Sequence, residues 1–160
     1  MSDSNISFDY YQDIYSILNS NLILKPINYY NKIKYIRNEI NEINNFYIDK
    51  KFSHILKEDK LKYLYSELDK YHYLNNITQF YINNKNNLKQ HDYFDMHGID
   101  KNGVLCILDV MFYFIKDLKK KCISIISGKG ELTLYRVIKK FLNNHQFNYT
   151  INNYKFIVKL

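Results

Sequence analysis

The spacing of apolar residues changes partway along this chain of 160 residues, and that change restricts its possible folds more than any other feature. Up to about residue 83, isoleucine, leucine and tyrosine recur every three or four residues, which is the repeat of amphipathic helices. This repeat predicts two long helices, at about 27–50 and 57–83. A polar run over 83–90 follows without any repeat and is interpreted as a linker. We therefore predict a helical region over residues 1–90 and a second domain over 91–160.

Short apolar runs alternate with helical patterns in the second domain, which predicts strands separated by helices. The predicted strands are Tyr93–His97, Cys122–Ile126, Gln146–Ile151 and Tyr154–Leu160, with helices capped by Asp100 and Thr133 after the first and second strands and an Asn152-Asn153 turn between the last two. The order is therefore βαβαββ. It predicts an α/β fold, a two-layer sandwich of helices on a sheet, preceded by the α-helical region.

A carboxylate and an imidazole lie two residues apart where the first predicted strand ends. Asp95 and His97 flank Met96 and precede Gly98. Because alternate residues of a strand point to one face, both side chains should project together, with Cα atoms roughly 6.6 Å apart. We predict Asp95 and His97 as a catalytic acid–base pair. The alternative is structural, with Asp95 capping a turn and His97 bonding a backbone carbonyl.

A glycine-rich loop follows the second predicted strand, with the sequence Gly128-Lys129-Gly130. It offers backbone N–H groups, a helix N-terminus and an ammonium group, all of which attract anions. We predict that this loop lies at the same rim of the sheet as Asp95 and His97 and cradles a phosphate group. A tight turn is the alternative role for the two glycines.

Basic residues gather in the same half of the chain. The formal net charge is +7, and residues 92–160 hold 11 Lys and Arg against 6 Asp and Glu. This excess favours an anionic ligand such as nucleic acid, although the abundance of lysine and asparagine also fits AT-rich codons. Arg136 and Lys139, in the following helix, are predicted to extend the contact along a nucleic-acid backbone, unless they form an ordinary solvated face.

The two motifs together resemble the Smr (small MutS-related) domain over residues 92–160. Its hallmarks are an LDLHG-type motif, here Phe94-Asp95-Met96-His97-Gly98, followed by a TGxG-type motif, here Ser127-Gly128-Lys129-Gly130. The resemblance implies a fold like the C-terminal domain of bacterial translation initiation factor three. It also implies endonuclease activity on messenger RNA at stalled ribosomes or on branched DNA. Asp95 and His97 would then serve cleavage, and Gly98 and the glycine loop would serve binding.

Three places depart from the family pattern or extend it. Asn102-Gly103 stands where many members carry Glu-Ala, which predicts a weaker helix start. Glu131-Leu132 follows the glycine loop, so a negative charge lies beside the predicted phosphate site. In eukaryotic members, a helical region often ends in an Ile-Phe-x-x-Asn-Asn stretch before the first motif. The segment Gln79–Asn84 occupies a similar place here.

The motifs predict an Smr-type endonuclease that prefers RNA to DNA, because no MutS-like ATPase region accompanies them. The alternatives are a nucleic-acid- or ribosome-binding module without cleavage, a DNA-nicking enzyme, and a protein-interaction domain whose helical half recruits a partner. No cofactor is required if His97 takes the proton of a 2′-hydroxyl group. A divalent cation held by Asp95 and His97 is the second choice.

The expected compartment follows from what the sequence does not contain. The polar start of the chain predicts no signal peptide, and no apolar run approaches the roughly 18 residues of a membrane span. Cys106 and Cys122 each fall in an apolar run without metal-ligand spacing, so we predict buried thiols in a reducing compartment. Together these features predict a cytoplasmic protein without a membrane partner.

Overall fold

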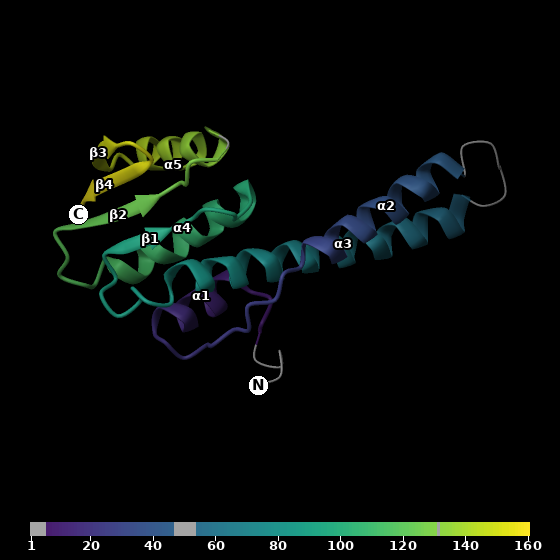
Figure 1. Ribbon diagram of the computed structural model, residues 1–160, viewed down its shortest axis with the longest axis horizontal. Helices are drawn as coiled ribbons and strands as arrows, with labels where there is room; N and C mark the ends of the chain where they lie inside the picture. Colours follow the sequence, from purple (N-terminus) through teal and green to yellow (C-terminus); the bar gives the residue numbers. More distant parts are fainter. Residues whose placement is uncertain (1–5, 47–53, 131) are drawn as a thin grey trace. The chain divides into compact units, whose positions relative to one another are not determined.

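The computed structural model describes residues 6–46, 54–130 and 132–160, and these residues form five helices and one mixed four-stranded sheet (Figure 1). The chain therefore has the predicted α/β class. The helices are α1 (Tyr10–Leu18), α2 (Tyr30–Phe46), α3 (His54–Asn84), α4 (Lys101–Ile115) and α5 (Leu132–Asn144), and the strands are β1 (Tyr93–Asp95), β2 (Cys122–Ile126), β3 (Asn148–Asn152) and β4 (Lys155–Lys159). Within the described residues, no helix is both long enough and apolar enough to cross a bilayer.

The contacts divide the chain into two compact units, and the division falls within α3. One unit is Ile27–Asn75, and the other joins the described residues up to Pro26 with Asn76–Leu160. The polar run at 83–90, which was interpreted as a linker, lies inside the unit that contains the sheet. Ile77 and Phe80 of α3 are fully buried, which explains why the end of this helix belongs with the sheet.

The unit Ile27–Asn75 contains α2 and most of α3, which pack as antiparallel helices. Ile36 and Ile40 of α2 form a small core with Leu64 of α3. Tyr29 lies against Tyr71, with 5.9 Å between ring centroids. The helices expected at about 27–50 and 57–83 correspond to α2 and α3, and the expected helical residues 47–50 lie outside the described residues.

The sheet has the order β1-β2-β4-β3, with β1 parallel to β2 and the other pairs antiparallel (Figure 1). Alternate residues of β1, β2 and β4 are buried, among them Phe94, Ile125 and Phe156. Helix α5 lies on this buried face, because the Tyr135 ring lies 5.1 Å from that of Phe156. Helix α4 packs beside α5, with the Phe112 ring of α4 lying 5.8 Å from the Phe141 ring of α5. The opposite face of the sheet carries half-buried and exposed side chains, and we call it the open face.

Three details of the prediction for the second half are wrong. Thr133 is the second residue of α5, which begins at Leu132, so it does not cap that helix. The hairpin turn is Asn153-Tyr154, one residue later than predicted, because Asn152 pairs with Lys155. Asn153 takes the left-handed φ of 56°, which asparagine tolerates better than most residues. The first strand ends at Asp95, two residues earlier than predicted.

The prediction of buried thiols is also wrong, since Cys106 and Cys122 are both free and exposed. Cys122 is the first residue of β2, where the buried positions are Ile123 and Ile125, so alternation turns the thiol to the open face. Cys106 lies on α4 between the buried Val104 and Leu108, off the helix face that packs inward. An apolar run in the sequence therefore did not specify which face its cysteine occupies.

A buried amide joins α1, α3 and α4. The Asn76 side chain is 2% exposed; its Nδ2 donates to the Tyr10 hydroxyl at 3.0 Å, and its Oδ1 accepts from the Asp100 N–H at 3.0 Å. Burial raises the pKa of Tyr10 to about 12. Asp100 caps α4 as predicted, by accepting from the Gly103 N–H at 2.8 Å. A Cβ atom on Gly103 would lie 2.4 Å from Asn76 Nδ2, so only glycine allows this close approach.

We expect Gly103→Ala to lower the stability of the protein by about 1–3 kcal/mol, as overpacking does in a filled core. Helix propensity alone predicts the opposite, a gain of about 1 kcal/mol. Thermal unfolding followed by circular dichroism distinguishes the two. Asn102→Ala, at the exposed neighbouring position, is the matched control and should melt at or above the wild-type temperature. A Gly103→Ala protein that melts no lower than wild type would show that Asn76 moves aside freely.

Candidate active site

Asp95, the last residue of β1, is in direct contact with His97, two residues further along the chain. His97 Nδ1 lies 2.8 Å from Asp95 Oδ1, and the His97 backbone N–H donates to the same oxygen at 3.0 Å. Between them, Met96 is fully buried, and its N–H donates to the Ile126 carbonyl at 2.8 Å. Parallel pairing with β2 therefore continues past the strand. It turns Met96 inward and leaves Asp95 and His97 on the other side.

The pair is accessible to solvent. The His97 side chain is 54% exposed, whereas that of Asp95 is 20% exposed. A carboxylate oxygen accepts hydrogen bonds, so the Asp95 contact places the proton of a neutral His97 on Nδ1. Nε2 then carries the lone pair and is free to take a proton from a ligand. This arrangement can perform acid–base chemistry on a molecule that approaches from solvent.

The glycine loop lies against His97. Because β1 and β2 are parallel, the segments that follow them leave the same end of the sheet. Gly128 has a φ of 85°, and a Cβ atom placed on it would lie 2.8 Å from His97 Cβ. Any larger residue at this position would displace His97 or strain the loop. The predicted convergence of the two motifs is therefore present in the structure.

The preceding serine anchors this loop to the hairpin. Ser127 is 5% exposed, and its N–H donates to the Tyr154 carbonyl at 3.0 Å. Lys129 is exposed, and a Cβ atom placed on Gly130 would have no atom within 4 Å apart from those of its chain neighbours. A phosphate group could thus approach the loop from solvent. Glu131, whose charge was expected beside this site, lies outside the described residues.

Arg136 and Lys139 are exposed on α5. Lys139 Nζ lies 5.9 Å from the centre of the Tyr135 ring on the same helix. Among the described residues, no hydrogen bond or ion pair links either side chain to Asp95 or His97. Their part in the site therefore remains a prediction about a longer ligand that extends onto α5.

Two asparagines at the end of α3 hold the Asp95–His97 segment, and sequence reasoning gave them no such role. The Asn84 side chain is fully buried; its Oδ1 accepts from the Asp95 N–H at 2.7 Å, and its Nδ2 donates to the Asp95 carbonyl at 3.0 Å. One side chain thus bonds both backbone groups of Asp95, as a neighbouring strand would. Asn83 Nδ2 donates to the His97 carbonyl at 2.8 Å and to that of Asp95 at 3.2 Å.

Gln79 completes this support. Its Nε2 donates to Asn83 Oδ1 at 2.7 Å, and its side chain lies beside Gly98, the residue after His97. The segment Gln79–Asn84 therefore contacts the first motif directly. The role of these residues could have been predicted from the similarity of this segment to Ile-Phe-x-x-Asn-Asn. Asparagine is so abundant in this chain that the Asn-Asn match carried little weight.

The arrangement contains few of the usual metal ligands. Within residues 6–46, 54–130 and 132–160, no group of three or more His, Cys, Asp or Glu side chains lies where it could hold a metal ion. Asp95 and His97 by themselves would supply two ligands. A cation bound here would need its remaining ligands from water or from the phosphate groups of a substrate.

Comparison of the chain with family models, with curated proteins and with solved structures found no match.

Proposed function

We propose that this protein is an endonuclease of the Smr type that cleaves RNA, with Asp95 and His97 as its acid–base pair. One observation carries the proposal: an exposed imidazole is held at 2.8 Å by a carboxylate and lies directly against the Gly128-Lys129-Gly130 loop. Either motif alone has a structural explanation. A reactive base beside an anion-binding loop is the combination that phosphodiester cleavage needs.

In the proposed reaction, Nε2 of His97 removes the proton from a ribose 2′-hydroxyl group. The 2′-oxygen forms a bond to phosphorus as the bond from phosphorus to the 5′-oxygen breaks, and the leaving oxygen takes a proton from the solvent at this exposed rim. Asp95 fixes the imidazole in the required tautomer and stabilises the imidazolium that forms. The products are a 2′,3′-cyclic phosphate and a 5′-hydroxyl end.

The glycine loop has the complementary task of stabilising charge on the phosphate. Lys129 supplies an ammonium group, and the loop supplies backbone N–H groups that no Cβ on Gly128 or Gly130 obstructs. Arg136 and Lys139 would contact the phosphates of adjoining nucleotides. The order of the two motifs and their placement after parallel strands support the Smr assignment and a fold like the C-terminal domain of initiation factor three. So does the contact of Gln79–Asn84 with the first motif.

One observation favours a second function, a nucleic-acid- or ribosome-binding module without cleavage. The Asp95 carboxylate also accepts the backbone N–H of His97, which is the bond of an Asx-turn. Asp95 could therefore serve only to shape the loop, and Lys129 with the glycines could serve only to bind. Nicking of branched DNA is the corresponding alternative for the substrate. A cytoplasmic location, where RNA and ribosomes are available, is part of the proposal.

The test is incubation of the purified full chain with end-labelled single-stranded RNA and with branched DNA, each with and without EDTA. We expect cleavage of the RNA, with cyclic phosphate ends, at a rate that EDTA changes less than twofold. The reason is that the proposed reaction uses protein groups alone. RNA cleavage that EDTA abolishes would replace the acid–base mechanism with a metal-dependent one.

The other outcomes separate the alternatives. Nicking of branched DNA with intact RNA would assign the enzyme to DNA. Binding of RNA that Lys129→Ala weakens, with no cleavage under any condition, would support the binding module. Failure to bind either polymer would overturn all the nucleic-acid functions, and would leave the helical region as a recruiter of protein partners.

A further inference from the structure

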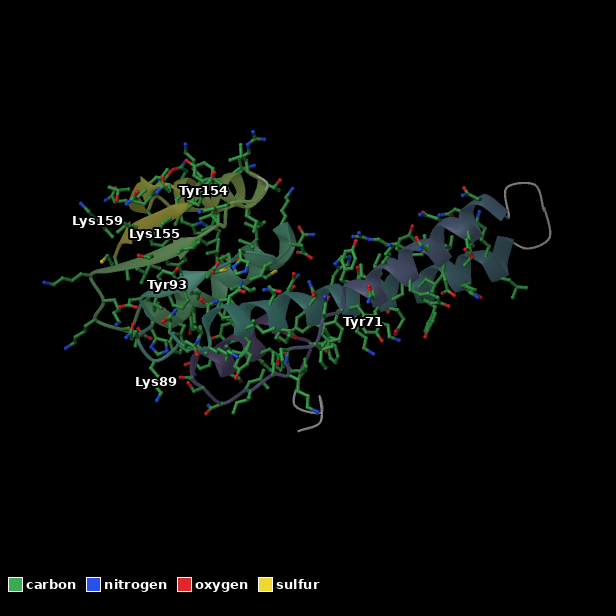
Figure 2. The ribbon with its side chains drawn as sticks, in the orientation of Figure 1. Tyr71, Lys89, Tyr93, Tyr154, Lys155 and Lys159 are labelled. Atoms are coloured by element: carbon green, nitrogen blue, oxygen red, sulfur yellow. The ribbon has the colours of Figure 1, made fainter. Side chains whose placement is uncertain are left out.

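Three rows of side chains cross the open face of the sheet, and the strand register defines them. The row nearest the active site contains Asp95, Ile126, Lys155 and Asn152; the middle row contains Tyr93, Ser124, Ile157 and Thr150; the far row contains Cys122, Lys159 and Asn148. Figure 2 shows Tyr93 on β1, with Lys155 and Lys159 on β4. Tyr93 and Asp95 lie two residues apart on one strand, so the open face leads directly to the catalytic pair.

A hollow of about 390 Å³ lies at the far end of β1 and β2 from His97. Its lining includes Asn87, Gln90, Asp92, Tyr93 and Ser124, residues that carry amide, carboxylate, aromatic and hydroxyl groups. Its volume is within the range of sites that hold small organic groups. Amide and carboxylate groups beside an aromatic ring are the side chains that bind nucleobases, by their edges and their faces respectively.

The turn that forms one wall of this hollow is fixed by hydrogen bonds. The Asn87 N–H donates to the Asn84 carbonyl at 2.8 Å, and that of Gln90 donates to the Asn87 carbonyl at 3.2 Å. The Lys120 ammonium donates to the Gln90 carbonyl. On the other wall, the Ser124 N–H donates to the Asp92 carbonyl at 2.7 Å. The hollow is thus formed before any ligand arrives, which lowers the entropic penalty of binding.

We propose that this hollow is a base-binding subsite for a single-stranded polynucleotide that crosses the open face towards His97. The inference rests on the proposed function and adds its substrate class, a single-stranded polynucleotide. The protein would recognise one unpaired base of this polynucleotide, on one side of the cleaved bond. The Tyr93 ring would stack on the base, and Asn87, Gln90 and Asp92 would bond its edge.

The charged residues on the open face indicate the path that the polynucleotide would follow. Lys159 lies across from Cys122 at the edge of the hollow, and Lys155 lies across from Ile126, the neighbour of Asp95. Both ammonium groups can bind phosphates along the path. Asp92 would repel phosphate, so the backbone must pass on the Lys159 side with the base turned towards Asp92. A duplex could not place an unpaired base in the hollow, which is why the proposal specifies a single strand.

The test is binding and photo-crosslinking with the full chain. The probes are a 5′-fluorescein RNA of mixed sequence that contains 4-thiouridine, and a DNA strand of the same sequence that contains 4-thiothymidine. Tyr93→Leu should weaken RNA binding, measured by fluorescence anisotropy, by about tenfold, as loss of one base–aromatic stack does. Tyr93→Phe should keep the wild-type affinity, because it keeps the ring. Tyr113→Leu, at a half-exposed tyrosine on α4, is the matched control and should bind as wild type.

Crosslinks should map by mass spectrometry to peptides that contain residues 87–93. Crosslinks there with RNA alone would show that the 2′-hydroxyl group contributes to binding. Crosslinks with both probes would show that the subsite accepts single-stranded RNA and single-stranded DNA. Both results support the subsite, even if no cleavage is found. An enzyme that cleaves RNA but crosslinks elsewhere, with unchanged affinity in Tyr93→Leu, keeps the proposed function and loses the subsite. If neither the RNA nor the DNA strand binds, the subsite is overturned, and a small free ligand would then be the better occupant.

Discussion

His97→Ala should reduce the rate of RNA cleavage by about 10²–10⁴-fold, the range that one positioned general base contributes. The expected loss is in chemistry and not in folding. The His97 side chain is 54% exposed, so its removal leaves no cavity in the core. The neighbouring backbone bonds, from the Asn83 amide to the His97 carbonyl and from the His97 N–H to Asp95, do not involve the imidazole.

Initial rates with end-labelled RNA measure the effect, and anisotropy with the same RNA measures binding. Binding should change by less than threefold. His145→Ala, at an exposed histidine just beyond α5, is the matched control and should cleave at the wild-type rate. Asp95→Asn should also slow cleavage, because an amide there can donate to His97 Nδ1 and favour the wrong tautomer. If His97→Ala cleaves as fast as wild type, the pair is structural and the proposed mechanism is wrong.

Asn84→Ala should lower the free energy of unfolding by about 2–4 kcal/mol and should also slow cleavage at temperatures where the protein is folded. The Asn84 side chain is fully buried and makes three hydrogen bonds, to the Phe80 carbonyl and to both backbone groups of Asp95. Its removal leaves the Asp95 N–H without a partner, at about 1–3 kcal/mol for a buried group left unpaired, and leaves the Asp95 carbonyl with only the longer bond from Asn83. The catalytic carboxylate then loses the support that fixes its backbone.

Urea unfolding gives the stability change, and the cleavage assay at low temperature gives the rate. Asn86→Ala, two residues further along and exposed, should change neither quantity. Lower stability with an unchanged cleavage rate would mean that Asn84 supports the fold without positioning Asp95. Unchanged stability would show that water replaces the amide, and would remove Asn84 from the site altogether.

The sequence was most informative where a local pattern decides the local structure. Alternation of apolar residues located the strands to within a few residues, and Asp100 was recognisable as a cap because its role depends only on its own turn. The meeting of His97 with Gly128 was also predictable. Two segments that follow adjacent parallel strands must leave the sheet at the same end.

The sequence was least informative where contacts join distant residues. Asn84 bonds the backbone of Asp95 across a turn. Asn76 accepts from the Asp100 N–H and lies so close to Gly103 that a Cβ atom there would collide with it. These contacts depend on how the end of α3 packs against the rest of the fold, and the spacing of apolar residues does not predict that packing. For the same reason, composition marked residues 83–90 as a boundary although the end of α3 packs with the sheet. Gly103, which local propensity scores as a defect, is required by its neighbour.

The framework beneath the reactive groups consists of carboxamides, and this has a consequence for experiments in solution. Asn83 and Asn84 hold the backbone of Asp95 and His97, and a carboxamide neither titrates nor responds to screening by salt. Acidity and ionic strength should therefore act on proton transfer and on phosphate attraction while the scaffold beneath them stays rigid. Titrating the buffer would isolate the first, and adding potassium chloride would isolate the second.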